Sequence, residues 1–296
     1  MFGERIRRAR AAALVCALLI WPTFVTGEST INETNKAAYG ANVGWINWAA
    51  DLTNGAVVGQ YFCTGYVYGA NVGWIHLGDT PTNMCAYIND SAADYGVNIV
   101  SGKCLRGFAW AANVGWLKFE TTGDPKIDLV SGVLSGFAYG ANIGWISLSN
   151  QQSFVQIDEM APGPDVDADG VPDYWELKYA TALGSVLGGT SDSDGDGVLD
   201  VDEYGADTDP LNSNEFLRIA SLLRSNEVVE LTLDVTKSSR FYSLETAEAL
   251  SNAIVWTDSG LGVFVPDTGA STTRSLDATG AVQRIFRAGA HIPLAP

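Results

Sequence analysis

The chain has 296 residues, of which only 17% are charged, and 34 Asp and Glu against 17 Lys and Arg give a formal net charge of −17. This acidic balance excludes recognition of nucleic-acid phosphates through a basic surface and disfavours docking on anionic lipid. With only two histidines in the sequence, a His-rich catalytic zinc site cannot be built.

Residues 1–27 predict an export signal. Four arginines precede an apolar run from Ala11 to Ile20, and the small residues Val25 and Gly27 suit cleavage after Gly27. The run is too short for a membrane span, and no second run follows it. We therefore expect a secreted, extracellular or cell-surface protein whose mature chain has no membrane span.

Four copies of one aromatic phrase form the next part, residues 28–157. They begin at Ala38 (AYGANVGWINWA), Val67 (VYGANVGWIHLG), Ala109 (AWAANVGWLKFE) and Ala138 (AYGANIGWISLS). Each copy predicts a β-hairpin, because alternating residues lead into and out of a corner that ends in Asn. The four corner asparagines are expected in the left-handed conformation: Asn42, Asn71, Asn113 and Asn142. The pattern leaves open whether the hairpins close into a barrel or stack openly.

Side chains alternate across a strand, so each hairpin has two unlike faces. One face predicts a core: Ile46, Trp48, Ile75, Leu77, Leu117, Phe119, Ile146 and Leu148. The other face, expected to be partly solvated, carries the repeat tryptophans Trp45, Trp74, Trp116 and Trp145, followed by Asn47, His76, Lys118 and Ser147. Inter-repeat packing is expected of any repeat array, so we favour packing of Trp and Tyr between adjacent hairpins over a stacking platform for sugar rings. His76 is expected to be merely exposed.

Three cysteines follow the leader: Cys63, Cys85 and Cys104. In an oxidising compartment this count predicts one structural disulfide bond and one leftover thiol. The sequence does not decide which two of them pair. Cys16 falls within the leader.

The sharpest chemical pattern is in residues 158–213. DVDADGVPDYWE and DSDGDGVLDVDE each place acids at loop positions 1, 3, 5, 9 and 12, with Gly at position 6. Calcium prefers about six to eight oxygen ligands, which this EF-hand-like spacing aims at one point, and position 7 adds a backbone carbonyl. We therefore predict two Ca²⁺ sites, with ligands Asp165, Asp167, Asp169, Val171, Asp173 and Glu176 in the first and Asp192, Asp194, Asp196, Val198, Asp200 and Glu203 in the second.

Between the loops, Tyr174 to Leu183 has helical composition, and no good amphipathic helix precedes either loop. The two loops and the trailing Gly205-Ala-Asp-Thr-Asp-Pro210 resemble the thrombospondin type 3 repeats of secreted bacterial proteins, and more loosely dockerin modules. The GANVGW hairpins are similar to a repeat found ahead of such segments in exported bacterial proteins. The resemblance implies extracellular calcium binding in a structural or adhesive setting, and names no ligand.

Short alternating segments at 228–235, 240–247, 253–260 and 281–289 predict a small antiparallel β-sandwich over residues 214–296. The whole chain is thus predicted to be mainly β: a hairpin array, a calcium-loop segment with a small helix, and a sandwich. The expected function is that of a non-enzymatic, secreted or cell-surface adhesion or structural protein, in which calcium rigidifies the link between two β-domains. The alternative is carbohydrate binding by the Trp/Tyr face, and the expected partners besides calcium are a polysaccharide or another surface protein.

Overall fold

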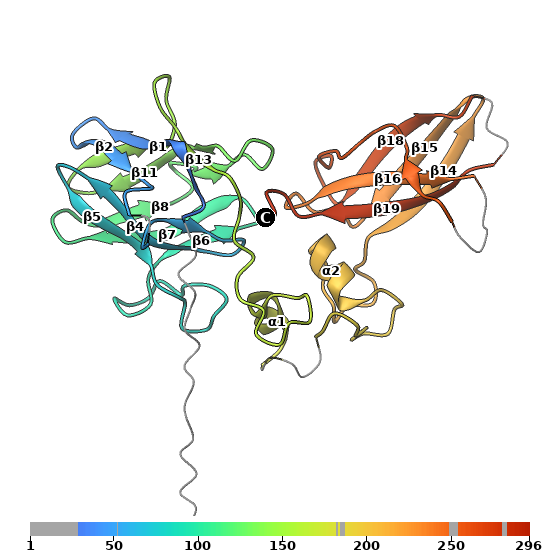
Figure 1. Ribbon diagram of the computed structural model, residues 1–296, viewed down its shortest axis with the longest axis horizontal. Coiled ribbons are helices and arrows are strands. Elements are labelled where there is room, and N and C mark those ends of the chain that lie inside the picture. Colours follow the sequence, from blue (N-terminus) through green and yellow to red (C-terminus); the bar gives the residue numbers. More distant parts are fainter. Residues whose placement is uncertain (1–28, 52, 182, 184–186, 249–253, 280–282) are drawn as a thin grey trace, which may run out of the picture.

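The computed structural model describes residues 29–51, 53–181, 183, 187–248, 254–279 and 283–296. The fold is mainly β, as predicted: a barrel and a smaller sandwich, with a short segment carrying two helices beside their junction (Figure 1). The export signal predicted for residues 1–27 lies outside the described residues, as does Cys16.

The four repeat hairpins close into an eight-stranded antiparallel barrel. Each hairpin supplies two neighbouring strands, and the first strand of the first hairpin pairs with the second strand of the fourth, which completes the ring. Closure gives every one of these strands a neighbour on both sides. The barrel strands are β1 (Ile31–Gly40), β2 (Gly44–Asn47), β4 (Cys63–Gly69), β5 (Gly73–Gly78), β7 (Cys104–Ala111), β8 (Gly115–Phe119), β11 (Phe137–Gly140) and β12 (Gly144–Ser147).

Short accessory strands extend the barrel at its margins. Two of them pair with β7, and the others pair with β1, β4 or each other. They are β3 (Val57–Val58), β6 (Val97–Val100), β9 (Lys126–Ile127), β10 (Leu134–Ser135) and β13 (Val155–Ile157).

The barrel interior is a packed apolar core. All eight residues of the predicted core face are buried, the most accessible being Phe119 at 4%. They line a cavity of only about 10 Å³, together with Val67 and Ala138. An eight-stranded barrel is just wide enough for side chains to fill it, so the interior of this barrel has no room for a ligand.

The asparagines of the hairpin corners tie neighbouring hairpins together. Each side-chain amide donates to a backbone carbonyl in the turn of the next hairpin around the ring, at 3.0 Å: Asn42 to Ile143, Asn71 to Val43, Asn113 to Val72 and Asn142 to Val114. The prediction that these asparagines are left-handed is wrong; the positive φ falls two residues later, on Gly44, Gly73, Gly115 and Gly144. Glycine adopts this conformation without a Cβ clash. The asparagine therefore need not be left-handed itself, and its side chain bonds to the neighbouring hairpin.

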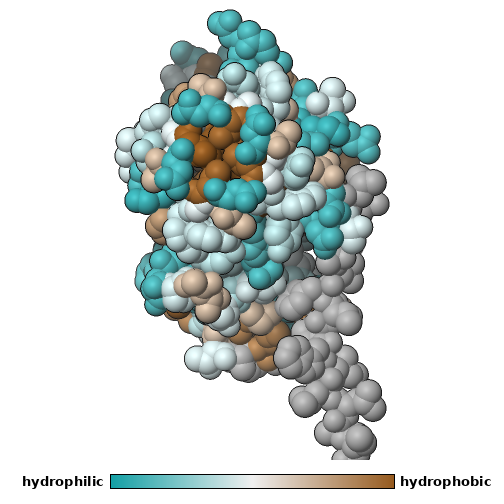
Figure 2. All heavy atoms as spheres, turned by 90° about the vertical axis from the view of Figure 1, so that its left-hand side faces the viewer, coloured by the Kyte–Doolittle hydropathy of each residue, from teal (hydrophilic) through white to brown (hydrophobic). Residues whose placement is uncertain are grey.

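The bonds of this asparagine ring place all four turns at one end of the barrel. Figure 2 looks onto the left-hand side of Figure 1 and shows a compact apolar patch surrounded by hydrophilic residues. Apolar turn residues are packed at this end; Val72, for example, is 1% exposed. The turns therefore close the end of the barrel.

The repeat tryptophans lie on the outside of the barrel and remain 39–52% exposed, which confirms a partly solvated face. Their packing differs from the favoured expectation, because each ring contacts the aromatic residue directly opposite it in its own hairpin. These pairs are Tyr39–Trp45, Tyr68–Trp74, Trp110–Trp116 and Tyr139–Trp145, with ring centroids 4.6–4.9 Å apart. Cross-strand neighbours are close enough for this contact, so the pairing stabilises single hairpins.

His76 is not simply exposed, because its side chain is only 12% accessible. The imidazole stacks on Tyr66 at 4.4 Å, its Nδ1 lies 2.7 Å from the Tyr95 hydroxyl, and its Nε2 lies 3.2 Å from Asp79. Tyr95 in turn packs against Trp116. His76 therefore helps to hold the loop before β6 against the second and third hairpins.

The predicted disulfide bond is absent, because Cys63, Cys85 and Cys104 are all free thiols. Cys63 is fully buried in the barrel core, where burial raises the pKa of its thiol to about 12. Cys85 lies in the loop before β6 and its Sγ contacts the Tyr174 carbonyl at 3.7 Å. No two of the three thiols are bonded to each other, which the number of cysteines alone could not show.

The C-terminal part is a β-sandwich of two three-stranded sheets, as predicted. Side chains of both sheets form one core, which includes Leu231 and Leu233 from one and Tyr242 and Leu244 from the other. One sheet contains β14 (Arg218–Ser225), β15 (Val228–Asp234) and β18 (Ser271–Asp277), and the other contains β16 (Phe241–Ala247), β17 (Thr257–Asp258) and β19 (Ile285–His291).

Two sandwich strands differ from their expected limits, and two were not expected. β17 has two residues instead of the stretch 253–260, and β19 is shifted towards the C-terminus relative to 281–289. β14 and β18 lack clear apolar alternation, since Leu222 and Leu223 are both exposed and β18 is mostly polar. Both strands are held in the sheet by their pairing with β15, although their own sequences lack the alternation that predicts a strand.

Candidate metal centre

Both acidic loops lead into a short helix that begins at loop position 9. Helix α1 (Asp173–Tyr179) follows Pro172, and helix α2 (Asp200–Ala206) follows Leu199, both of which are extended. α1 is shorter than the predicted helix from Tyr174 to Leu183, because the backbone is already extended at Ala180. α2 was not predicted. Acids at the start of a helix suit its positive end, which favours this placement.

The two loops share one hydrogen-bonding pattern. The position-1 carboxylates accept from backbone amides within the loop: Asp165 from Asp169 and Gly170, and Asp192 from Gly195, Asp196 and Gly197. The position-6 glycines are left-handed, with φ of 95° at Gly170 and 94° at Gly197. The sharp bend predicted at position 6 is therefore present in both loops, and it curls each loop around its carboxylates.

Each loop brings its three alternating aspartates together. Asp165, Asp167 and Asp169 offer carboxylate oxygens within 4.8 Å of one another, and Asp192, Asp194 and Asp196 do the same. The position-7 amides of Val171 and Val198 donate to the position-5 carboxylates at 2.9 and 2.8 Å. These bonds fix the direction of the backbone at position 7, where we predict a carbonyl ligand.

The second loop is followed by a buried acid, Glu203, at its position 12. The residue is only 1% exposed, and its Oε2 is buried without a hydrogen-bond partner, as are one carboxylate oxygen of Asp194 and one of Asp196. Burial raises the pKa of Glu203 to about 7; the hydrogen bond from Thr208 opposes this rise, and the charges of the loop aspartates add to it. Three acidic groups of this segment thus have a buried, unsatisfied oxygen, and the charges of two of them act on the third, an arrangement that a cation stabilises.

The first loop repeats this feature at position 9. Asp173 is fully buried; its Oδ1 accepts from the Val166 amide at 2.9 Å, and its Oδ2 has no hydrogen-bond partner. Burial raises the pKa of Asp173, and the charges of Asp165 and Asp167 act in the same direction. Glu176 at position 12 is also buried, at the same helical position as Glu203 in the second loop.

Asp200 has different surroundings from Asp173 although both occupy position 9. Its Oδ2 accepts from the hydroxyls of Ser191 and Ser193 at 2.5 and 2.7 Å, and its Oδ1 accepts from the Ser193 amide at 3.0 Å. Both carboxylate oxygens of the predicted ligand Asp200 therefore already accept hydrogen bonds from the protein. The serines were missed, although their alternation with Asp192 was a visible signal for side-chain capping of the loop.

Helix α2 is bonded to both β-domains. Towards the barrel, the Tyr204 hydroxyl accepts from the Gln60 side chain at 3.0 Å, both residues being buried. Towards the sandwich, the buried guanidinium of Arg240 donates to the carbonyls of Tyr204 and Gly205 at 3.0 and 2.8 Å. A cation at the end of a helix satisfies carbonyls that have no partner within the helix.

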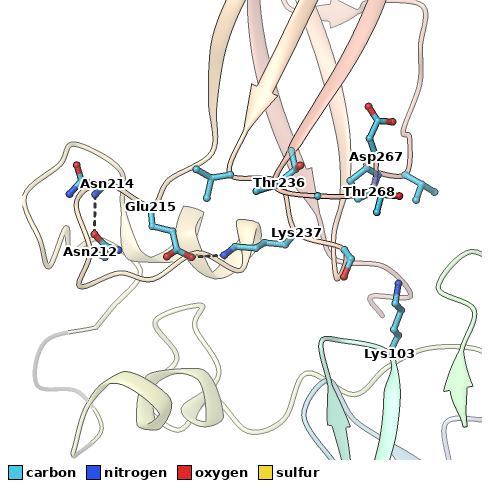
Figure 3. Close-up of a pocket in the computed structure, with 14 residues that line it drawn as sticks. Lys103, Asn212, Asn214, Glu215, Thr236, Lys237, Asp267 and Thr268 are labelled. Atoms are coloured by element: carbon cyan, nitrogen blue, oxygen red, sulfur yellow. Dashed lines mark hydrogen bonds and ion pairs between the residues drawn. The ribbon is translucent and has the colours of Figure 1, made fainter. Parts of the chain in front are cut away.

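A polar cleft of about 810 Å³ opens beside this junction (Figure 3). Lys103 reaches into it from the barrel side, while Thr268 and Lys237 line the sandwich side. Lys237 is engaged in an ion pair with Glu215 at 2.5 Å. Away from the cleft the two β-domains touch directly, since Phe241 and Leu294 pack against the barrel core, and the helical segment is a second route of contact between them.

The donor sets of both loops fit a hard cation, because they consist of carboxylate oxygens. No His or Cys belongs to either group of the described residues.

A comparison of the chain with protein-family models, curated proteins and solved structures finds no match. Within the described residues, no helix has the length and apolar character needed to cross a membrane.

Proposed function

We propose that the protein is a non-enzymatic, secreted or cell-surface structural protein that binds two calcium ions and uses them to fix the barrel against the sandwich. The observation that carries this proposal is the position of Glu203. One of its carboxylate oxygens is buried without a hydrogen-bond partner, the charges of Asp194 and Asp196 act on it, and its own helix is bonded to both domains. An ion at this point would act on a helix that is bonded to both halves of the molecule.

Electrostatic repulsion explains why the ion would stiffen the link. Without a cation, ionised Asp194, Asp196 and Glu203 repel one another at short range in a site partly removed from water. Calcium, when bound, supplies the positive charge that offsets this repulsion. Because the native loop binds the ion better than an unfolded chain does, binding stabilises the folded segment. With α2 held, the contacts of Tyr204 with Gln60 and Arg240 keep their geometry.

The experiment is a measurement of bound metal and of thermal unfolding on the mature chain. The metal-free protein should take up two calcium ions per chain and unfold at a higher temperature with calcium than with a chelator. Asp165→Ala and Asp192→Ala should each remove one ion. Glu203→Ala should lose the second-loop ion, whereas Asp202→Ala, an exposed acid in the same helix, should bind both. A chain that binds no calcium, or that unfolds identically with and without it, rejects the proposal.

Carbohydrate binding is a second candidate function, because the barrel leaves its aromatic pairs in water. Between the second and third hairpins the rings form a continuous series from Trp74 through Tyr66, His76 and Tyr95 to Trp116. Sugar rings stack on exposed aromatic rings of this kind. A polysaccharide that shifts tryptophan fluorescence in the native chain but not in a Trp74→Ala variant would support this candidate, and no response to any of a panel of polysaccharides would dismiss it.

A further inference from the structure

The backbone that enters the second loop lies directly against the first loop. A Cβ at Gly189 would be 1.9 Å from the carbonyl oxygen of Asp169, and a Cβ at Gly188 would be 2.8 Å from its carboxylate. Neither glycine has a positive φ, so the need for glycine here is one of space. Asp169 belongs to the first group of converging carboxylates. Any displacement of Gly188 or Gly189 therefore acts on a predicted ligand of the other loop.

The same backbone is fastened to the start of helix α2. The Ser191 hydroxyl accepts from the Gly188 amide at 2.7 Å and lies 2.5 Å from Asp200 Oδ2. The Asp200 amide in turn donates to the Ser191 carbonyl at 2.8 Å. Asp200 is fully buried and is the first residue of α2, the helix that carries Glu203. The chain of contacts thus runs from Glu203 through Asp200 and Ser191 to the Gly188–Gly189 pair.

A small apolar core joins the two loops on another side. Val171, at position 7 of the first loop, packs with Leu187, which precedes the second loop, and with Trp175 and Tyr204 from the two helices. All four side chains are buried, the most accessible being Tyr204 at 7%. Close-packed groups of this kind move together rather than independently. The two loops are therefore parts of one packed unit.

We propose that the two loops bind calcium with positive cooperativity, and that Ser191 is a positioning residue which transmits the effect from the predicted ligand Asp200 through Gly188 and Gly189 to Asp169. This rests on the proposed function. An ion in the second loop draws in Glu203, fixes the start of α2 and, through Ser191, sets the backbone against which Asp169 is held. By linkage, an ion in the first loop favours the second loop to the same degree.

The test is calorimetric titration of calcium chloride into the metal-free mature chain. The wild type and the single-loop variants Asp165→Ala and Asp192→Ala are compared. Cooperativity predicts that the loop left intact in each variant binds calcium more weakly than in the wild type, by about fivefold or more and by the same factor in both. An unchanged affinity of the remaining loop overturns the inference. Absence of any binding by the wild type rejects the proposed function instead.

Two further variants test the route of the coupling. Ser191→Ala removes the hydroxyl that joins Gly188 to Asp200, leaves only the long 3.4 Å contact of the Gly188 amide with Asp200 Oδ2, and keeps every predicted ligand. Both ions should therefore still bind while the cooperativity falls. Gly189→Ala should weaken the first loop, whereas Gly205→Ala, whose added methyl group meets nothing within 4 Å, should not. If cooperativity persists unchanged in Ser191→Ala, the assigned route is wrong. That outcome remains informative if Gly189→Ala fails to fold.

Discussion

Replacing Glu203 by Gln should have opposite effects on the metal-free and the calcium-bound protein. Glutamine has the shape of glutamate and can still accept the hydrogen bond that Thr208 donates at 3.2 Å. It removes the charge that repels Asp194 and Asp196. The metal-free variant should therefore be more stable than the wild type, although it lacks the predicted second-loop ligand.

The size of this effect follows from the titration of Glu203. Its pKa is raised from 4.5 to about 7, chiefly by burial, and one pKa unit corresponds to about 1.4 kcal/mol. Ionised Glu203 thus destabilises the metal-free fold by at most about 3.5 kcal/mol, and because Asp194 and Asp196 are only partly buried, so that water screens their charges, we expect about 1–2 kcal/mol. Since the folded-state pKa is the raised one, this penalty is absent below pH 4.5, grows as the pH rises to about 7, and is complete above that.

Urea unfolding in the presence of a chelator, followed by tryptophan fluorescence, measures this difference. Glu203→Gln should exceed the wild type in stability at about pH 8 and match it at about pH 4.5, and calcium should stabilise the variant less than the wild type. Asp202→Asn serves as the control, because Asp202 is an exposed acid of the same helix. Equal stabilities of wild type and Glu203→Gln at pH 8, or a gain that does not depend on pH, would refute the reasoning.

Three further predictions concern the rest of the molecule. Arg240→Met should leave the Gly205 carbonyl without its side-chain donor and remove one of the two hydrogen bonds to the Tyr204 carbonyl, which lowers the unfolding free energy by about 2 kcal/mol, measured by urea titration. Asn113→Ala should open one bond of the asparagine ring and lower the stability by about 1 kcal/mol in the same measurement, and an unchanged midpoint would contradict the role of the ring. Cys63 should resist alkylation until the protein unfolds, because it is buried and the pKa of its thiol is raised to about 12, whereas Cys85 and Cys104 should react earlier in a mass-spectrometric time course.

The core of the barrel could be predicted from sequence because strand alternation is a local signal. Ile46 and Trp48 are two residues apart, so they share a face whatever surrounds the hairpin. Closure could not be predicted in this way. The bond from Asn42 reaches a carbonyl 101 residues away, and no pattern within a hairpin indicates how many neighbours it has. The same corner motif would serve an open stack of hairpins equally well.

The candidate site shows the same division between local and distant information. The spacing of Asp192, Asp194 and Asp196 predicts their convergence, because a loop with glycine at position 6 curls on itself. The contacts of Asp200 with the serines, and of Arg240 with α2, depend on burial and on distant parts of the chain. α2 itself was missed because it begins inside the loop and contains Gly205, a residue that disfavours helices.

The exposure of the repeat tryptophans is not explained by the construction of the barrel. Strand pairing, the interior side chains and the asparagine ring join each hairpin to the next, whereas each Trp pairs with the ring opposite it in its own hairpin, and Tyr95 adds a contact between the second and third hairpins. Such a pair contributes about 0.5–1.5 kcal/mol beyond the area that it buries. Smaller β-branched residues would also stabilise a cross-strand pair, and they would leave less apolar surface in water. The large rings at all four equivalent positions give the outer face the stacking surface that the proposed carbohydrate binding would use.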